Sequence, residues 1–324
     1  MTRTRQQLTV AELAPLARVA VGPARALSAV TRLRGGSKKG VYRLAFDDAT
    51  TAVAYVWSPD EDYWDQPDSD PRDPFSHASG LDLFTASHTR LSALGVRTPR
   101  LLHVDSTANA AVVEDVPGGS LEEALDRDPD AARPTVERLA EMLEIMRDCT
   151  TAGYGKVALV DNGGSSYGGS CERLVTDRAL ADIAETAVRD ERVAEARDAL
   201  EEAVHSLAAE VRPRAHRTLV HGELGPDHVL VDAGGDPVLI DIEGLMYFDA
   251  EWEHVFLRFR FGPHYDVLRV PDLDEHRLRL YRLAMHLNLV AGPLRLLDGD
   301  YPAREFMRGI AEYNLVRALA HVGC

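Results

Sequence analysis

Residues 219–253 read LVHGELGPDHVLVDAGGDPVLIDIEGLMYFDAEWE, in which two short apolar runs, Val229–Val231 and Val238–Ile240, stand on either side of Gly234 and Gly235. Short apolar runs around a pair of glycines predict two antiparallel strands joined by a tight turn. A β-hairpin brings its two open ends side by side. The residues that flank this hairpin should therefore lie close together.

Those flanking residues are mostly acidic. Glu223, Asp227 and His228 come just before the first strand, and Asp241 and Glu243 come just after the second. Gathered carboxylates can bind Mg²⁺, and a carboxylate can accept a proton from a hydroxyl group. The stretch therefore predicts a catalytic or metal-binding cluster; the alternative is a hairpin whose acids are only solvated.

The layout resembles the aminoglycoside phosphotransferase and choline kinase family. That family carries His-Gly-Asp, an Asn five residues after the Asp, and later Ile-Asp and Gly-Asp-Pro. The corresponding residues here are His221-Gly222-Glu223, His228, Ile240-Asp241 and Phe248-Asp249-Ala250.

The resemblance implies a role for each of these positions. Glu223 would be the catalytic base, and His221 would position its loop. His228 and Asp241 would bind the metal. Glu243 would either add a second metal contact or hydrogen-bond nearby backbone. Asp249, and Glu253 in the same way, would cap and pin the helix that follows.

The resemblance also implies an α+β, two-lobed, protein-kinase-like fold. Residues 1–116 would form a small antiparallel β lobe that binds the nucleotide. Residues 117–324 would form a larger, mainly helical lobe with the catalytic loop and the substrate site. The local patterns agree, because apolar spacing predicts strands early in the chain and helices later. The strands are expected at Leu27–Leu33, Val41–Phe46, Thr51–Trp57 and Ala110–Val116, and an N-terminal helix at Val10–Val21.

A glycine-rich loop, Gly35–Gly40, lies between the first two of these strands. Glycine lets backbone N–H groups approach phosphates closely. The resemblance implies that Gly36, Ser37, Lys38 and Lys39 contact the phosphates of ATP. It also implies that Glu114 and Val116 lie at a hinge whose backbone holds the adenine.

A lysine is missing from the expected place. Kinase-type folds hold the α- and β-phosphates with a lysine of the third strand, paired with a helix glutamate. The strand Thr51–Trp57 has no lysine, and Asp82 is the only acid of the helix Leu81–Leu94. Lys38, Lys39 or Arg43 could supply the charge. We expect the loop to be solvent-exposed, and its lysines could equally be ordinary solvated residues.

The composition limits the possible partners and compartments. The chain has 324 residues, 45% of them hydrophobic, and a net charge of −16. It has no apolar run of membrane-spanning length and no signal-peptide core, and its three cysteines have no metal-type spacing. We therefore expect a reduced, cytoplasmic protein. The acidic balance disfavours nucleic acid and anionic membranes and suits a cationic substrate, although it could also serve solubility alone.

Together these observations predict an ATP- and Mg²⁺-dependent phosphotransferase. Its acceptor would be a hydroxyl of a small molecule, an antibiotic or a metabolite, that could be cationic. Two alternatives stay open. One is a kinase of Ser or Thr in a peptide natural-product precursor. The other is a catalytically weak pseudokinase that acts as a binding partner or scaffold, because Glu223, His228 and the lysine-free strand depart from the family pattern.

Overall fold

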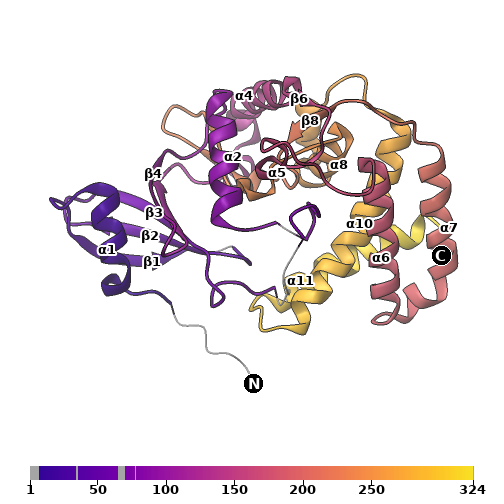
Figure 1. The fold of residues 1–324 in the computed structure, drawn as a ribbon, viewed down its shortest axis with the longest axis horizontal. Helices are drawn as coiled ribbons and strands as arrows, with labels where there is room; N and C mark the ends of the chain where they lie inside the picture. The colour runs from indigo at the N-terminus through magenta and orange to yellow at the C-terminus, as the bar shows by residue number, and fades with distance from the viewer. Residues whose placement is uncertain (1–6, 34–35, 65–69, 77, 324) are drawn as a thin grey trace. The chain divides into compact units, whose positions relative to one another are not determined.

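The computed structural model of the chain describes residues 7–33, 36–64, 70–76 and 78–323, so Gly35 of the glycine-rich loop lies outside the described residues. Antiparallel sheets and many helices confirm the predicted α+β class (Figure 1). The chain divides into two compact units. The first takes its described residues from Met1–Pro67, Ala78–Leu139 and Pro226–Gly244, and the second from Asp68–His77, Ala140–Gly225 and Leu245–Cys324. The expected division into lobes after Val116 stays a prediction.

The first unit is built on one antiparallel sheet of five strands in the order β1-β2-β3-β5-β4. Its register pairs Val41 with Tyr55 and Tyr55 with Ala111, so β3 is a central strand. Each predicted strand is present, within two residues of its expected bounds. The strands are β1 (Leu27–Arg32), β2 (Gly40–Phe46), β3 (Thr51–Val56), β4 (Leu101–Asp105) and β5 (Ala110–Glu114).

A helix covers one face of this sheet, and a second helix contributes aromatic contacts to the other. α1 (Val10–Val21) begins with a capping box between Thr9 and Glu12, a known start signal for helices. Its buried leucines pack on alternate residues of β2 and β3, among them Leu44 and Ala54. On the other face, Tyr55 meets Phe84 of α2 (Leu81–Ala93), with ring centroids 5.5 Å apart. β3 is therefore buried on both faces, which explains its apolar sequence.

The predicted hairpin is confirmed and belongs to the first unit. β9 (Val229–Val231) matches its prediction, and β10 (Pro237–Leu239) lies one residue earlier than expected. The short 3₁₀ helices η1 (Pro226–His228) and η2 (Ile242–Gly244) flank the hairpin. α3 (Leu121–Arg127) begins after Ser120, which caps it in a capping box with Glu123. α4 (Pro129–Asp148) contributes its residues up to Leu139 to this unit.

The second unit is mainly helical, around a small antiparallel sheet in the order β6-β8-β11-β7. The glycine-rich segment 154–170 contains a short strand and one helical turn. The strands are β6 (Thr150–Thr151), β7 (Gly155–Lys156), β8 (Arg217–Val220) and β11 (Met246–Phe248). The helices are α5 (Val157–Val160), α6 (Cys171–Ala187), α7 (Glu191–Ala209), α8 (Ala250–Phe261), η3 (Gly262–His264), α9 (Tyr265–Leu268), α10 (Glu275–Asp298) and α11 (Arg304–Ala320).

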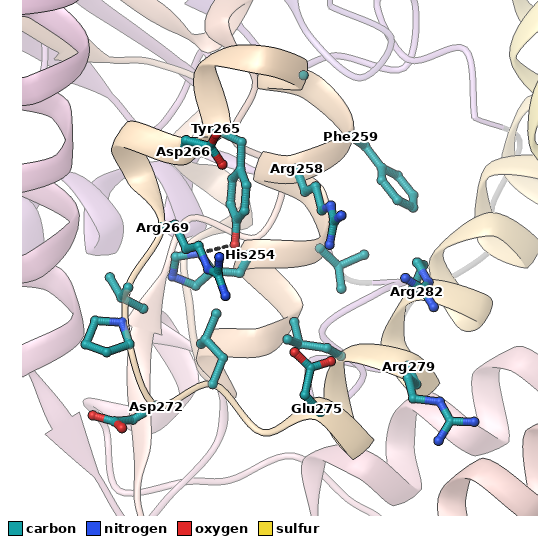
Figure 2. Close-up of a pocket in the computed structure, with 16 residues that line it drawn as sticks. His254, Arg258, Phe259, Tyr265, Asp266, Arg269, Asp272, Glu275, Arg279 and Arg282 are labelled. Atoms are coloured by element: carbon teal, nitrogen blue, oxygen red, sulfur yellow. Dashed lines mark hydrogen bonds between the residues drawn. The ribbon is translucent and has the colours of Figure 1, made fainter.

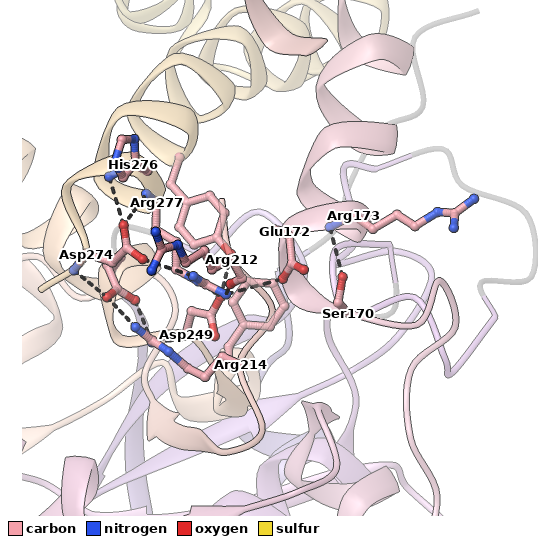
Figure 3. Close-up of polar contacts among 12 residues, drawn as sticks. Ser170, Glu172, Arg173, Arg212, Arg214, Asp249, Asp274, His276 and Arg277 are labelled. Carbon is pink, nitrogen blue, oxygen red and sulfur yellow. Dashed lines mark hydrogen bonds and ion pairs between the residues drawn. The ribbon is translucent and has the colours of Figure 1, made fainter. Parts of the chain in front are cut away.

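A buried ion-pair network ties the helices of the second unit together (Figure 3). Arg277 of α10 is only 1% exposed, and its Nε donates to Asp249 Oδ2 at 2.9 Å. Tyr281 donates to the same oxygen at 2.6 Å. The predicted capping role of Asp249 is therefore wrong, since its side chain makes no cap hydrogen bond to α8 and binds α10 instead. No described helix is both long and apolar enough for a bilayer crossing.

Candidate functional site

The first unit contains a buried cluster around Lys39, which directly precedes β2. The Lys39 ammonium donates to Asp241 Oδ1 and to Glu243 Oε1, each at 2.5 Å. Asp241 directly precedes η2 and Glu243 lies within it, immediately after the hairpin. The cluster therefore joins the glycine-rich loop to the end of the hairpin. It brings together Lys39, which was predicted to bind phosphate, and Asp241 and Glu243, which were predicted on the metal side.

Lys39 is 6% exposed, so the expectation of a solvent-exposed loop is wrong at this residue. The reason lies in the turn before it. Gly36 has φ 74°, and a Cβ there would lie 2.6 Å from the Lys39 carbonyl oxygen, so the turn requires glycine. Past this turn the Lys39 side chain runs inward, and its ammonium lies 5.2 Å from the centroid of the Tyr55 ring. Tyr55 belongs to β3, the strand that lacks a lysine.

The charge of Lys39 is held firmly in place. Burial lowers the pKa of the Lys39 ammonium, but the carboxylates of Asp241 and Glu243 outweigh burial and raise this pKa well above its ordinary value. Burial also raises the pKa of the neighbouring Tyr55 hydroxyl. The first unit thus contains a permanently charged cation between two carboxylates.

The two carboxylates differ in their surroundings. The Asp241 side chain is 44% exposed, and its backbone has φ 58°, an uncommon left-handed conformation for a residue other than glycine. Such outliers concentrate at functional sites. The Glu243 side chain is only 4% exposed, and its Oε2 is buried without a hydrogen-bond partner among the described residues. Asp241 can therefore meet a ligand from solvent, whereas Glu243 faces inward.

The predicted metal ligands fit Mg²⁺ unequally. His228 Nε2 lies 3.7 Å from Asp241 Oδ2, but an imidazole suits Mg²⁺ less well than oxygen ligands. In the described part of the chain, no group of three His, Cys, Asp or Glu side chains could hold a metal ion. Mg²⁺ in kinases, however, needs only one or two carboxylates together with substrate phosphates. Lys39 bonds to both Asp241 and Glu243, but only Asp241 is exposed enough to reach a solvent ion, so a metal role stays a prediction for Asp241.

The other residues that were predicted to bind the nucleotide lie in the same unit. Those in and near the glycine-rich loop contact other side chains. Ser37 accepts a hydrogen bond from Trp64 Nε1 at 2.9 Å, and the Lys38 ammonium lies 5.2 Å from the Trp64 ring centroid. Arg43 donates to both carboxylate oxygens of Asp115.

The expected hinge residues follow or end β5. The Glu114 carboxylate accepts hydrogen bonds from Arg97 Nη2 and from Arg100. Burial raises the pKa of Glu114, but these hydrogen bonds outweigh burial and lower the pKa below its ordinary value. Val116 is 5% exposed, two residues after β5. Glu114 is thus an ionised side chain held by arginines, and any contact with adenine in this region stays a prediction.

The expected catalytic loop belongs to the second unit. It leaves β8 at His221, which is fully buried, and passes through Gly222, whose φ of 93° favours glycine, to Glu223, whose side chain is exposed. Glu253 of α8, only 4% exposed, accepts a hydrogen bond from the Gly222 N–H at 2.7 Å. Burial raises the pKa of Glu253 to about 7, and the charge of Glu223 adds to the rise. Glu253 therefore holds the loop and does not only pin its helix, as the sequence had suggested.

The structure thus gathers Lys39, Asp241, Glu243 and His228 in one unit, and His221, Glu223 and Glu253 in the other. Sequence reasoning gave Lys39 and Glu243 separate roles and did not foresee that they pair. The sequence did contain a signal for this pair. The chain lacks the usual strand lysine and helix glutamate, but it has Lys39 in the loop and Glu243 two residues after Asp241.

Comparisons with known proteins agree with this fold. The fold is similar to a thermostable mutant of aminoglycoside phosphotransferase APH(4)-Ia, at 18% identity, TM-score 0.61, and coverage of 90% of this chain and 95% of that one. It is also similar to choline kinase LicA from Streptococcus pneumoniae, at 12% identity, TM-score 0.61, and coverage of 95% and 98%. A putative fructosamine-3-kinase from Thermobifida fusca is similar at 19% identity, TM-score 0.53, and coverage of 94% and 98%.

These structures share the protein-kinase-like fold, which confirms the predicted architecture. The sequence has no significant match among curated proteins. A family model described as the phosphotransferase enzyme family matches residues 30–286, which is most of the chain. The chain therefore belongs to the phosphotransferase enzyme family.

Proposed function

We propose that this chain transfers the γ-phosphoryl group of ATP to a hydroxyl group of a small molecule. Membership of the phosphotransferase family supports the reaction class. The observation that carries the proposal for this chain is the buried Lys39 ammonium, 2.5 Å from both Asp241 and Glu243. It supplies the cation that the sequence lacks in β3.

Lys39 and Glu243 would together do the work of the usual lysine–glutamate pair. The Glu243 carboxylate is the more buried partner and would keep the ammonium in place. Asp241, which is more exposed, would exchange its bond to Lys39 for other charges when ATP binds. The Lys39 ammonium would then donate to the phosphates, because phosphoryl transfer depends mainly on positioning and on neutralising charge.

Asp241 is the side chain best suited to hold Mg²⁺ together with the phosphates. When bound, the metal would neutralise part of the phosphate charge. ATP as the donor is also supported by a structural relative: the thermostable APH(4)-Ia mutant was solved in a ternary complex with ADP and hygromycin B. That relative is 17% identical to this chain, so the likeness concerns the fold.

Glu223 would accept the proton of the acceptor hydroxyl. As the new O–P bond forms, the bond between the γ-phosphorus and the bridging oxygen breaks, and ADP leaves. Glu223 is one methylene longer than the family's Asp, and a misplacement of ~1 Å can reduce a rate by roughly 10²-fold. Glu253 supports the role by fixing the backbone at Gly222, one residue before the base.

The acceptor is proposed to be a small cationic molecule, because the net charge of −16 would attract cations. A Ser or Thr hydroxyl of a peptide precursor would use the same chemistry. The two acceptors differ in a measurable way, since only a peptide would carry phosphate on a side chain that mass spectrometry can locate.

A second candidate is a pseudokinase that binds a partner without catalysis. The altered positions Glu223 and His228 favour it, because both depart from the family pattern. The Lys39 cluster argues against it, since it places a fixed cation beside an exposed aspartate, and binding of Mg-ATP needs both a cation and a metal-binding carboxylate.

Calorimetric titration with ATP, with and without Mg²⁺, separates these candidates. A phosphotransferase should bind ATP in a metal-dependent way, and Asp241→Asn should abolish the metal dependence while leaving the fold intact. Lys38→Ala is the matched control and should bind as the wild type does. If wild type fails to bind Mg-ATP, the phosphotransferase proposal is wrong for this chain. If Asp241→Asn binds it as tightly as wild type, the metal assignment is wrong.

A further inference from the structure

The second unit contains a cavity of about 750 Å³ that takes no part in the site described above (Figure 2). It lies between α8, the short helices η3 and α9, the segment 269–273, and the beginning of α10. None of its lining residues is a predicted catalytic, nucleotide-binding or metal-binding residue. Its volume falls within the range of small-molecule pockets in proteins.

Arginines dominate the charge of the lining. Arg258, Arg269 and Arg282 line the cavity, and none of the three has a hydrogen bond or an ion pair with any residue that the structure describes. Arg282 is only partly exposed, and its Nε is buried without a partner among those residues. A buried, unsatisfied guanidinium donor is costly in the absence of a ligand.

These three arginines differ from others of the same unit. Arg279, which also lines the cavity, donates to Glu210 at 3.3 Å and points away from the other arginines (Figure 2). Arg214 donates to both carboxylate oxygens of Glu251. In a chain with 52 acidic and 36 basic residues, three arginines without a described acidic partner gather at one cavity. Arg258 and Arg269 are exposed to solvent, and Arg282 is the partly buried one.

Three acids also line the cavity, but they do not neutralise it. The side chain of Asp272 points outward, and Asp266 lies at the edge on α9 (Figure 2). Only Glu275 points toward the centre (Figure 2), and it makes no ion pair with a described residue. Three guanidinium groups therefore line the cavity beside one carboxylate that points toward its centre.

We propose that this cavity binds a small molecule with carboxylate or phosphate groups, held by Arg258, Arg269 and Arg282. A guanidinium group donates two parallel hydrogen bonds to a carboxylate or a phosphate, so it recognises both. Glu275 would accept a hydrogen bond from a hydroxyl or an amine of the same ligand. A long polyanion is disfavoured, because the net charge of −16 would repel it.

The wall of the cavity adds polar contacts. His254 Nδ1 lies 3.2 Å from the Tyr265 hydroxyl, and both residues line the cavity. Burial lowers the pKa of His254 to about 4, so its imidazole is neutral at pH 7 and adds no charge. His254 follows Glu253 in α8, and Glu253 bonds to the catalytic loop. The anion site and the loop therefore share one helix, although the proposed site does not depend on the proposed reaction.

The test is calorimetric titration with two probes, inorganic phosphate and citrate, at constant ionic strength. Wild type should bind at least one of them at millimolar concentration or tighter. Arg258→Gln and Arg282→Gln should each weaken that binding by about tenfold, as expected for the loss of a charge-assisted hydrogen bond. Arg173→Gln is the matched control, because Arg173 is exposed on α6 and its guanidinium points away from the neighbouring charges (Figure 3).

Each result decides the proposal. Unchanged binding in the control and weakened binding in both pocket variants would support it. Equal weakening in all three variants would indicate a general charge effect and would overturn it. Absence of binding to wild type, or binding that survives both pocket substitutions, would overturn it as well. Failure to bind Mg-ATP would not affect it, so the two proposals fail separately.

Discussion

Removing the charge of Lys39 should destabilise the first unit far more than removing the charge of its neighbour Lys38. Lys39→Met keeps the apolar stem of the side chain and deletes the ammonium that bonds to Asp241 and Glu243 at 2.5 Å. Asp241, at 44% exposure, can be hydrated instead. Glu243, at 4%, would remain as a buried charge without its partner.

The expected magnitude follows from that burial. Breaking a buried ion pair costs about 3–5 kcal/mol of the free energy of unfolding, and exposure of Asp241 favours the lower end, about 3 kcal/mol. Lys38→Met loses only a partly exposed contact with the Trp64 ring, which is worth about 0.5–1 kcal/mol. The expectation that the loop lysines are solvent-exposed is thus wrong for Lys39, which is buried, whereas Lys38 is partly exposed and its small effect on stability stays a prediction.

Urea denaturation followed by tryptophan fluorescence measures the difference, because Trp57 and Trp64 both belong to the first unit. A double-mutant cycle of Lys39→Met with Glu243→Gln should give a coupling energy above about 1 kcal/mol, since residues in one ion-pair network do not contribute independently. If Lys39→Met and Lys38→Met shift the midpoint equally, or the two substitutions of the cycle add, the buried pair is refuted.

Three further predictions concern the second unit. The raised pKa of Glu253, from an ordinary 4.5 to about 7, means that its carboxyl group favours the folded state below pH 4.5 and that this contribution is lost as the pH rises to about 7. Glu253→Gln should then be more stable than wild type by roughly 1–3 kcal/mol at pH 8 and similar to it near pH 4.5, and thermal unfolding at the two pH values checks this. Glu223→Gln should remove phosphoryl transfer but spare ATP affinity, which turnover and calorimetry measure separately; unchanged turnover would exclude Glu223 as the base. Asp249→Ala leaves Arg277 buried without its closest carboxylate and should cost about 3–5 kcal/mol by urea denaturation, whereas a loss under 1 kcal/mol would mean that other acids compensate.

The local sequence pattern predicted those elements of the fold that depend on contacts between residues close together in the chain. The helix Val10–Val21 has its bounds because Thr9 and Glu12 form a local capping box. The strand Val229–Val231 was predictable because the glycine pair that follows it specifies a turn. Hydrophobic period and turn residues act over a few positions, so one sequence was enough to find them.

The pairings that build the candidate site are not local, and the sequence could not provide them. Lys39 and Glu243 are separated by most of the chain, and only the folded first unit brings them together. Asp249 has the sequence position of a helix cap, but Arg277 and Tyr281 of a distant helix compete for its carboxylate. In both cases a partner far away in the sequence occupies the side chain in place of the role that the local sequence suggested, a solvated loop lysine for Lys39 and a helix cap for Asp249.

The most direct test of the account is the affinity of Lys39→Met for Mg-ATP, measured by calorimetric titration beside wild type and Lys38→Met. The titration is carried out at a temperature at which far-ultraviolet circular dichroism shows all three proteins folded. If Lys39 supplies the cation for the phosphates, Lys39→Met should bind Mg-ATP at least about tenfold more weakly than wild type, a loss of about 1.4 kcal/mol or more, and Lys38→Met should stay within about twofold. Binding by Lys39→Met within about twofold of wild type would contradict the central claim that this lysine replaces the missing strand lysine.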